Sequence, residues 1–502
     1  MHCAPQSQPS WGSSMNITNV RSLVQDLHER GQIIRSDREI DPRFEITGAL
    51  KALEGGAALL FENIKGYPGQ RVFCNPFSND ARVCDIFGSS DVAGLKHVGL
   101  AAMRNPIAAR QVDSAPSQEV VISGDDVDVL GTIPIPTYTE TDPGRILGGV
   151  VLLSGEGVGS CISYKRFHIQ GKNWASIAFI PGSHFEHWVL ARRKAGQNLP
   201  LTINISPPPA VMAIAAGGGI PAVIPVGSDE LGVAGALQGS GIGITKAKTV
   251  DAMSIAEAEW VIEGYVDTGA RIAESAQRAK DPGGYAPFFP EWHGHEGEAE
   301  MSYKMVVTGI TRRRDNPIFD LWLAHSLQLP NIIRLVNDGP LLDYLDRLSP
   351  GLIRDVNALD SMKQMGLVIQ VRKRFRRDDA VVRNLILAAF GLSMLLRMVI
   401  VVDDDVDIYS AEEIMWAMHT RLDAQSNMMV IPDPGTSGRA NGPLQPVARI
   451  GLDLTAPKAS QQHYWRGEYP QVDLRRWFSG DQIASAVAEQ GEYARLLARR
   501  RV

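Results

Sequence analysis

Several features that mark common classes of protein are scarce or missing in this sequence. Its 502 residues contain four cysteines (Cys3, Cys74, Cys84 and Cys161) and no C-x-x-C pair. This argues against a zinc ribbon or a disulfide framework and favours a reducing compartment, the cytoplasm. The formal net charge is -6, whereas proteins that bind nucleic acids usually carry a basic surplus. We therefore expect a cytoplasmic protein without a nucleic-acid partner.

Long apolar segments are also absent. The first fourteen residues, MHCAPQSQPSWGSS, are polar and lack the apolar core of a signal peptide, so we expect a disordered leader over residues 1–14. The most apolar long segment, residues 384–402, is interrupted by Arg397. A helix followed by a strand explains this segment better than a membrane span does, and no membrane attachment is predicted.

The order of the patterned segments predicts an α+β protein of several domains. Residues 15–115 combine an amphipathic helix over 19–30 with two strands around a Gly-Pro turn, which indicates a small α/β domain. Short strand-like runs separated by glycine and proline follow over residues 116–316 and indicate a β-barrel or sandwich. An α/β pattern returns over residues 317–460, and a helical tail is expected over residues 461–502.

Two runs in the C-terminal part favour a parallel sheet. RMVIVV is β-branched enough for a buried parallel strand, and Ser410 with Glu413 forms an S-x-x-E capping box for a helix that continues to Arg421. Between them lie four acids, which could bind a metal or a phosphate group. Acids after a parallel strand more often cap the next helix or bind backbone, and we favour that role. They are Asp403, Asp404, Asp405 and Asp407.

Common catalytic and nucleotide-binding motifs are missing. The sequence has no G-x-S-x-G and no H-E-x-x-H, and the glycine-rich GSGIG at residues 239–243 matches neither a P-loop nor G-x-G-x-x-G. The segment YAPFFPEWHGH, residues 285–295, is a stronger candidate. If it is extended, Glu291, His293 and His295 leave the same face, as metal ligands would. Alternatively, burial among aromatic rings would keep Glu291 protonated for acid-base chemistry, or the segment is a core loop without chemistry.

The run SYKRFHIQ, residues 163–170, has the pattern of a strand in the barrel-like region. We expect Ser163, Lys165 and His168 near one another, and Tyr164 and Arg166 on the other face. A buried arginine needs an anionic partner because an unpaired buried charge is unfavourable. That partner is either a structural glutamate or the carboxylate of a substrate.

Four long segments carry a resemblance to a known family: SYKRFHIQGKNWASIAFIPGSH, DELGVAGALQGSGIGITKAKTVDAMSIAEAEWVIEG, YAPFFPEWHGH and RMVIVVDDDVDIYSAEEIMWAMHTRLDA, with ARIGLDLT after them. In this order they resemble the UbiD family of reversible decarboxylases, over about residues 20–473. The resemblance implies a central split β-barrel of the flavin-reductase type, flanked by N-terminal and C-terminal α/β regions. It also implies a homodimer or higher homo-oligomer built through the C-terminal part.

The resemblance further implies prenylated FMN as cofactor, supplied by a separate flavin prenyltransferase, with Mn²⁺ or Mg²⁺ and often K⁺ at its phosphate. The modified flavin takes up the electrons left when CO2 departs from an sp2 carbon. The family's carboxylate-binding arginine falls on Arg166 and its proton-donating glutamate on Glu291. The implied cofactor-binding residues are Ser163, Tyr164, Arg166, Ser183, His184, Gln238, Gly239 and Ser240, and the implied substrate pocket is Ile180, Tyr285, Phe288, Phe289 and Trp292.

The sequence departs from the family pattern at the metal site and in the acid loop. The family's metal-binding asparagine falls on Cys161 and its metal-binding glutamate on Gly243, whereas the metal-binding histidine is kept as His184. The first glutamate of the acid loop falls on Tyr285, and Phe390 sits near the place of a phosphate-contacting lysine. Burying a phosphate without cations or donors is unfavourable. We therefore expect one of three outcomes: backbone donors and other ligands hold the cofactor, it binds weakly and is lost on purification, or this branch has lost the family's usual activity.

The leading prediction is a reversible non-oxidative decarboxylase of an aromatic, heteroaromatic or α,β-unsaturated carboxylic acid. The alternative is a non-catalytic UbiD-like subunit, or a small-ligand-binding protein that has lost the cofactor site. A zinc hydrolase that uses Glu291, His293 and His295 is the least favoured. The sequence does not identify the acid.

Overall fold

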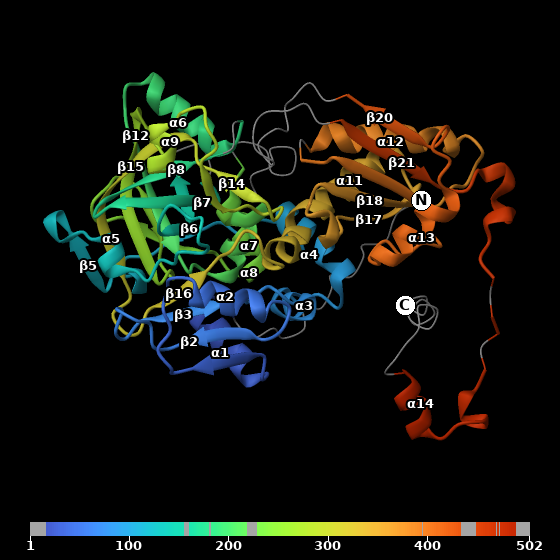
Figure 1. Ribbon diagram of the computed structural model, residues 1–502, viewed down its shortest axis with the longest axis horizontal. Coiled ribbons are helices and arrows are strands. Elements are labelled where there is room, and N and C mark those ends of the chain that lie inside the picture. Colours follow the sequence, from blue (N-terminus) through green and yellow to red (C-terminus); the bar gives the residue numbers. More distant parts are fainter. Residues whose placement is uncertain are drawn as a thin grey trace.

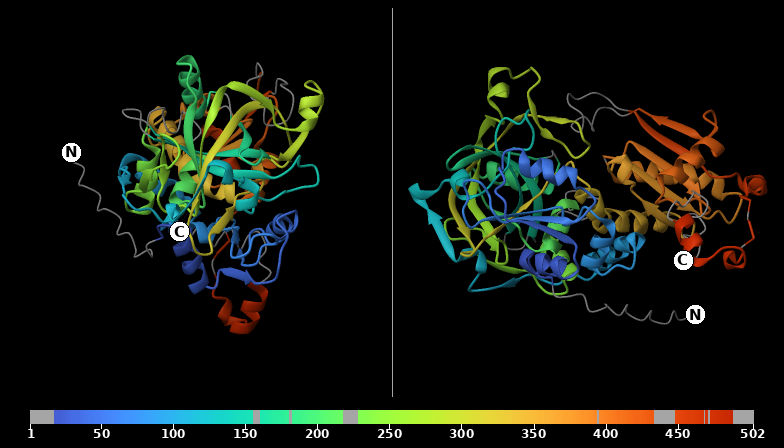
Figure 2. Two further views of the ribbon diagram at one scale, coloured as in Figure 1. Left: turned by 90° about the vertical axis from the view of Figure 1, so that its left-hand side faces the viewer. Right: turned by 60° about the horizontal axis from the view of Figure 1, so that its bottom comes forward.

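The computed structural model describes residues 17–154, 160–179, 182–217, 228–393, 395–432, 448–467, 469–470 and 472–487. It confirms the predicted fold class: an N-terminal α/β region and a C-terminal α/β domain flank a central β-barrel (Figure 1). The right-hand view of Figure 2 shows the same division between barrel and C-terminal domain. The expected leader over residues 1–14, the pocket residue Ile180 and the tail beyond Val487 lie outside the described residues.

The N-terminal region forms as its pattern predicts. Helix α1 (Val20–Glu29) begins at Asn19, whose side chain accepts a hydrogen bond from the backbone N–H of Ser22, and its apolar face is buried. The sheet has the strand order β1-β2-β3-β16, in which β2 and β3 are the expected antiparallel pair. The elements are β1 (Ile33–Ser36), α2 (Glu45–Ala52), β2 (Ala58–Phe61), β3 (Arg71–Cys74), α3 (Asp80–Phe87) and α4 (Val92–Arg104).

The fourth strand of this sheet comes from far along the chain. Strand β16 (Ile318–Leu321) pairs in parallel with β3, although the sequence pattern groups these residues with the C-terminal domain from residue 317 on. A short apolar strand carries no local signal of which sheet it joins.

The central barrel closes through six antiparallel strands in the order β12-β9-β6-β7-β8-β15, with β12 paired again to β15. Its interior contains large apolar side chains such as Leu147, Phe167 and Ile203. Strands β4, β10 and β11 form a separate small sheet outside the barrel. The bounds are β4 (Arg110–Gln111), β5 (Val120–Ser123), β6 (Ile146–Ser154), β7 (Ser160–Gly171), β8 (Trp174–Ala178), β9 (Leu199–Ile205), β10 (Gly243–Lys246), β11 (Met253–Ile255), β12 (Trp260–Ala273) and β15 (Met301–Arg312).

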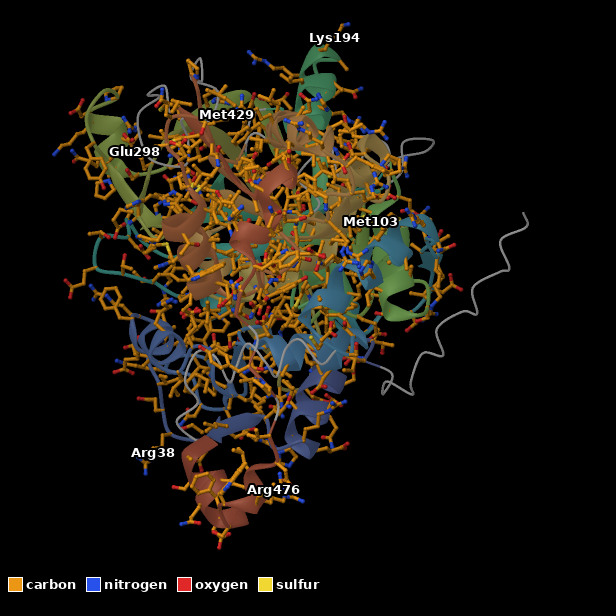
Figure 3. All side chains as sticks on the ribbon, turned by 90° about the vertical axis from the view of Figure 1, so that its right-hand side faces the viewer. Arg38, Met103, Lys194, Glu298, Met429 and Arg476 are labelled. Carbon is orange, nitrogen blue, oxygen red and sulfur yellow. The ribbon has the colours of Figure 1, made fainter. Side chains whose placement is uncertain are left out.

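Helices and one hairpin surround the barrel. The outward-facing Val150, Leu152 and Ile162 share a core with Phe73 and Phe77 of the N-terminal region, so these two regions form one packed unit. Helix α6 packs on the barrel's own core through Phe185 and Val189 and ends at Lys194 on the outer edge of the molecule (Figure 3). The elements are α5 (Val129–Thr132), α6 (His184–Lys194), α7 (Pro209–Gly217), α8 (Glu230–Gln238), α9 (Ala276–Lys280), β13 (Pro287–Pro290) and β14 (Glu296–Glu298).

The C-terminal domain is a five-stranded sheet between two helices, with the strand order β17-β18-β19-β21-β20. Strands β18 and β19 are parallel, as predicted, and alternate residues of β19 face α12 (Val399, Val401) or α13 (Ile400, Val402). Ser410 caps α13 as the capping box predicts. The elements are α10 (Gln328–Ile333), the π-helix η3 (Arg334–Asp338), α11 (Gly339–Leu348), β17 (Ile353–Asn357), β18 (Gly366–Val371), α12 (Asp378–Leu392), β19 (Met398–Asp403), α13 (Ala411–Arg421), β20 (Met428–Ile431), β21 (Arg449–Leu454) and α14 (Gly480–Val487). None of the helices described is long and apolar enough to cross a bilayer.

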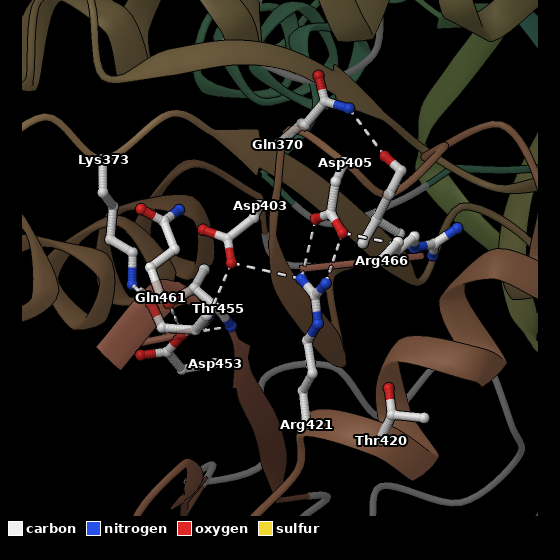
Figure 4. A network of polar contacts seen from close by, with 12 residues as sticks. Gln370, Lys373, Asp403, Asp405, Thr420, Arg421, Asp453, Thr455, Gln461 and Arg466 are labelled. Atoms are coloured by element: carbon white, nitrogen blue, oxygen red, sulfur yellow. Dashed lines mark hydrogen bonds and ion pairs between the residues drawn. The ribbon is translucent and has the colours of Figure 1, made fainter. Parts of the chain in front are cut away.

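The four acids at the end of β19 and just after it have the role that we favoured only in part. Asp403 and Asp407 bind backbone N–H groups, whereas Asp404 and Asp405 form ion pairs with arginines. Arg421 binds both carboxylate oxygens of Asp405, at 3.0 and 2.6 Å, and also contacts Asp403 (Figure 4). Asp404 pairs with Arg372, and Asp407 accepts a hydrogen bond from the backbone of Tyr409 at 2.9 Å. Asp403 Oδ2 also accepts from the backbone N–H of Ala456 at 2.7 Å, whereas its buried Oδ1 has no hydrogen-bond partner among the described residues.

Asp320 of β16 provides a test of the packing between the N-terminal sheet and the barrel. It is buried, its Oδ1 has no hydrogen-bond partner among the described residues, and burial raises its pKa to about 7. Its pKa in the unfolded chain is about 3.9, so the folded state binds the proton more tightly. The free energy of unfolding therefore falls as the pH rises from about 4 to about 7.

We expect Asp320→Asn to change the free energy of unfolding more favourably at pH 8 than at pH 5. The difference between the two pH values should be roughly 2–3 kcal/mol. Urea unfolding of both proteins at the two pH values measures this difference. An equal change in stability at both pH values would show that Asp320 is not held protonated in the fold.

Candidate functional site

Arg166, in the middle of β7, is the centre of the candidate site. Its Nη2 donates to Glu274 Oε2 at 3.0 Å and its Nη1 donates to Glu291 Oε1. The guanidinium carbon lies 4.7 Å from the centroid of the Phe288 ring and 5.7 Å from that of Phe289. Burial opposes the charge of Arg166, but the two carboxylates outweigh it and its pKa is raised. The partner of this arginine is therefore a pair of glutamates.

Glu274 was missed by the sequence analysis. It follows β12 directly and is fully buried, and its Oε2 also accepts a hydrogen bond from the backbone N–H of Glu300 at 2.8 Å. Its own backbone oxygen contacts Nδ1 of His168. The only local signal is its position one residue before Ser275, the N-cap of α9, and this signal gives no hint of Arg166.

His168 lies on the face of β7 that carries Arg166. It contacts Glu274 and meets the edge of the Phe288 ring, with 5.9 Å between centroids. The prediction that His168 accompanies Ser163 and Lys165 is wrong, because residues two apart on a strand share a face. His168 helps to hold the backbone at Glu274.

The acid loop is a hairpin and not an extended segment. Strands β13 and β14 pair, and the chain reverses between them, with the N–H of Glu291 donating to the oxygen of His295 at 2.9 Å. The expected common face of Glu291, His293 and His295 is therefore wrong: Glu291 reaches Arg166, while His293 packs against His295 and Trp292. Burial, followed by the charge of His295, lowers the pKa of His293 to about 4.

The predicted substrate-pocket residues separate into two groups. Phe288 and Phe289 are buried and lie against Arg166. Tyr285 is 63% exposed, and Trp292 contacts His293. The second carboxylate beside Arg166 is thus Glu274 and does not come from the position of Tyr285.

A second polar cluster gathers ligand-type side chains from three elements. Cys161 of β7, His184 at the start of α6 and Glu230 at the start of α8 are buried, and their ligand atoms lie within 4.8 Å of one another. His184 Nδ1 is 3.0 Å from Glu230 Oε1, and Glu230 Oε2 accepts from the backbone N–H of Ile162 at 2.6 Å. In the part of the chain that the structure describes, no other such group of three is present.

The carboxylate beside His184 and Cys161 is Glu230, and Gly243 is not part of this cluster. Gly243 lies in β10, which belongs to a separate small sheet with β4 and β11. Glu230 lies in the quoted segment DELGVAGALQGSGIGITKAKTVDAMSIAEAEWVIEG, thirteen residues before Gly243.

In the second cluster, the buried side chains of Cys161 and Glu230 lie beside the positive N-terminal ends of two helices. Burial, followed by the nearby Glu230, raises the pKa of Cys161 to about 12, and burial also raises the pKa of Glu230. Burial lowers the pKa of Lys165. The N-termini of α6 and α8 favour an anion here. A divalent cation together with a phosphate group would suit this arrangement.

The remaining predicted cofactor residues are divided between this cluster and other places. Ser163 Oγ is buried without a described partner, and Ser183 caps α6. Tyr164 stacks on Trp322 with 4.6 Å between ring centroids. The structure does not bring Gln238, Gly239 and Ser240 to the cluster. Gln238 is the last residue of α8, about 12 Å from Glu230 along the helix axis, and the other two residues follow it. Phe390 belongs to the core of the C-terminal domain.

Comparison with known proteins identifies the family. Three domain profiles of 3-octaprenyl-4-hydroxybenzoate carboxy-lyase match in order: the N-terminal domain over residues 24–101, the Rift-related domain over 110–324 and the C-terminal domain over 331–453. The chain belongs to the UbiD family. It is therefore a carboxy-lyase of this class.

Similar proteins support the assignment along nearly the whole chain. Gallate decarboxylase of Lactiplantibacillus plantarum is 28% identical over 466 residues, which cover 89% of this chain and 91% of the relative. The apo 3,4-dihydroxybenzoic acid decarboxylase of Klebsiella pneumoniae is 27% identical, with a TM-score of 0.81 over 92% of this chain and 100% of the other. An evolved dimeric form of the UbiD-class enzyme HmfF from Pelotomaculum thermopropionicum, in complex with prFMN, is 25% identical, with a TM-score of 0.79 over 93% and 99%.

Proposed function

We propose that this UbiD-family chain is a reversible, non-oxidative decarboxylase of an aromatic carboxylic acid that uses prenylated FMN. The observation that carries the proposal is the pairing of Arg166 with two glutamates beside the rings of Phe288 and Phe289. An arginine with exchangeable carboxylate partners and aromatic walls can receive a flat molecule that carries a carboxylate.

The residues of the second cluster fit the phosphate end of the cofactor. Cys161, His184 and Glu230 offer ligands for a cation, and the N-termini of α6 and α8 offer backbone N–H groups. Buried His184 Nε2 and Ser163 Oγ have no hydrogen-bond partner among the described residues. When bound, the modified flavin would supply the electron sink for loss of CO2.

The chain's own part in the reaction follows from the contacts of Arg166. The carboxylate of the substrate replaces that of Glu291 on the guanidinium, while Glu274 stays fixed by the backbone N–H of Glu300. Once released from Arg166, Glu291 acts as the general acid. After CO2 leaves, it delivers a proton to the carbon that carried the carboxylate.

A hydroxylated benzoic acid is the substrate class that we favour. The similar proteins named above include decarboxylases of gallate and of 3,4-dihydroxybenzoic acid. The buried Phe288 and Phe289 add flat apolar surface next to Arg166.

The alternative of a non-catalytic UbiD-like subunit rests on the departures at Cys161 and Tyr285. The structure weakens its motivation, because Glu230 stands beside His184 and Glu274 stands beside Arg166. Glu230 and Glu274 therefore supply the two carboxylates whose loss was suggested by Gly243 and Tyr285.

The proposal predicts a cofactor-dependent release of CO2. Protein produced together with a flavin prenyltransferase should carry the cofactor and release CO2 from some members of a panel of hydroxybenzoic, heteroaromatic and acrylic acids. Protein produced without the prenyltransferase should release none. Mass spectrometry of the extracted flavin and CO2 measurement check this. Equal activity of the two preparations, or cofactor-loaded protein inactive on the whole panel, would contradict the proposal.

A further inference from the structure

The cluster of Cys161, His184 and Glu230 differs from an ordinary manganese or magnesium site in one ligand. Mg²⁺ and Mn²⁺ suit oxygen ligands, whereas a thiolate favours Zn²⁺ and other softer ions. The donors here are one sulfur, one imidazole nitrogen and one carboxylate oxygen. This set is typical of zinc sites that keep a position open for a further ligand.

The geometry of the cluster is compatible with zinc. Two ligands about 2.0 and 2.3 Å from a tetrahedral Zn²⁺ lie about 3.5 Å apart. The ligand atoms of the cluster lie within 4.8 Å of one another, and all three side chains are buried. Small side-chain rotations would bring them onto one ion. In addition, buried His184 Nε2 has no hydrogen-bond partner among the described residues.

We propose that Cys161, His184 and Glu230 bind Zn²⁺ in preference to Mn²⁺ or Mg²⁺, with the sulfur of Cys161 as a direct ligand. Binding breaks the S–H bond of Cys161, forms an S–Zn bond and releases one proton to solvent, so the step involves no oxidation. The inference rests on the proposed function only in that the same ion would face the cofactor phosphate.

Competition dialysis tests the preference directly. Metal-stripped protein is dialysed against equal concentrations of Zn²⁺, Mn²⁺ and Mg²⁺, and bound metals are measured by mass spectrometry. We expect close to one Zn²⁺ per chain and at least a tenfold excess of zinc over manganese. Cys161→Asn should lower zinc affinity at least tenfold. Cys84→Ala is the matched control, because Cys84 is also buried but lies in an apolar core, and it should bind zinc like the unaltered protein.

Cobalt shows directly whether the sulfur of Cys161 binds the metal. A Cys161 that only supports the fold would give no such signal. Co²⁺-loaded protein should show a near-ultraviolet thiolate-to-cobalt charge-transfer band. This band should be absent in Cys161→Asn and in Cys161→Ser and present in Cys84→Ala, with circular dichroism confirming that each variant is folded. If Cys161→Asn does not fold, Cys161→Ser carries the test.

The outcomes separate this inference from the proposed function. Preferred binding of Mn²⁺ or Mg²⁺, or a missing charge-transfer band in the unaltered protein, would overturn it even if the enzyme releases CO2. Zinc bound through Cys161 in a protein that releases no CO2 would support it and count against the proposed function.

Discussion

Arg166→Ala is expected to lower kcat/KM for CO2 release by a factor of about 30 to about 5,000. Removal of one partner of a partly buried charge pair weakens binding by about 2–5 kcal/mol, and each 1.36 kcal/mol corresponds to a factor of ten. Arg166 is the group between Glu274 and Glu291 that a substrate carboxylate would contact. Initial rates of CO2 release with the cofactor-loaded protein measure the effect.

Arg166→Ala is also expected to lower the stability of the fold, so loss of activity has to be separated from loss of stability. Without Arg166, the buried Glu274 would lose its charged partner, and breaking a buried pair costs about 3–5 kcal/mol of stability. The double variant Arg166→Ala with Glu274→Gln removes the unpaired charge and should regain much of that stability, measured by urea unfolding. It should remain inactive.

A second control keeps the positive charge at position 166 but changes the geometry of the hydrogen-bond donors. Arg166→Lys keeps a positive charge but cannot bind two carboxylates in the planar arrangement of a guanidinium. We expect it to fold and to retain only a small part of the activity. If the double variant, or Arg166→Lys, released CO2 at the original rate, Arg166 would not bind the substrate carboxylate.

The parts of this protein that could be predicted from sequence are those determined by neighbouring residues. Helix α1 follows from an apolar stripe and the capping residue Asn19, and α13 follows from the capping box of Ser410. The parallel strand β19 follows from its β-branched residues. In each case the signal lies within a few residues of the structure that it specifies.

The parts that could not be predicted depend on contacts between distant segments. Glu274 meets Arg166 across 108 residues of sequence, and β16 joins a strand that precedes it by more than 240 residues. A short strand or a lone glutamate carries no local mark of such a partner. Glu230 is also brought to His184 by the fold, across 46 residues of sequence, whereas the resemblance placed the metal-binding glutamate on Gly243.

The two glutamates beside Arg166 differ in the property that a proton donor needs. Glu274 is fully buried and held by the N–H of Glu300 as well as by Arg166. The side chain of Glu291 is 24% exposed, lies at the turn of a hairpin, and has Arg166 as its ion-pair partner. A donor must be recharged with a proton from solvent after each turnover, so we assign delivery to Glu291 and positioning of Arg166 to Glu274.

Glu291→Gln should therefore lower kcat by about 10²–10⁴-fold, the usual range for loss of a general acid, with a smaller change in KM. The amide oxygen of glutamine can still accept the hydrogen bond from Arg166, so the fold should persist. Glu291→Asp keeps a carboxyl group and should retain part of the activity. Tyr285→Phe is the matched control in the same loop, because Tyr285 is 63% exposed and should leave kcat unchanged.

Deuterium distinguishes proton delivery from a purely structural effect. When the proton transfer is slowed by Glu291→Gln, that step should limit turnover, and the rate in D2O should fall relative to H2O more than it does for the unaltered enzyme. An unchanged kcat and solvent isotope effect in Glu291→Gln would remove Glu291 from this role. A lower kcat together with a larger solvent isotope effect in Glu274→Gln would then assign proton delivery to the buried glutamate, whose proton would have to arrive through Arg166 or the substrate.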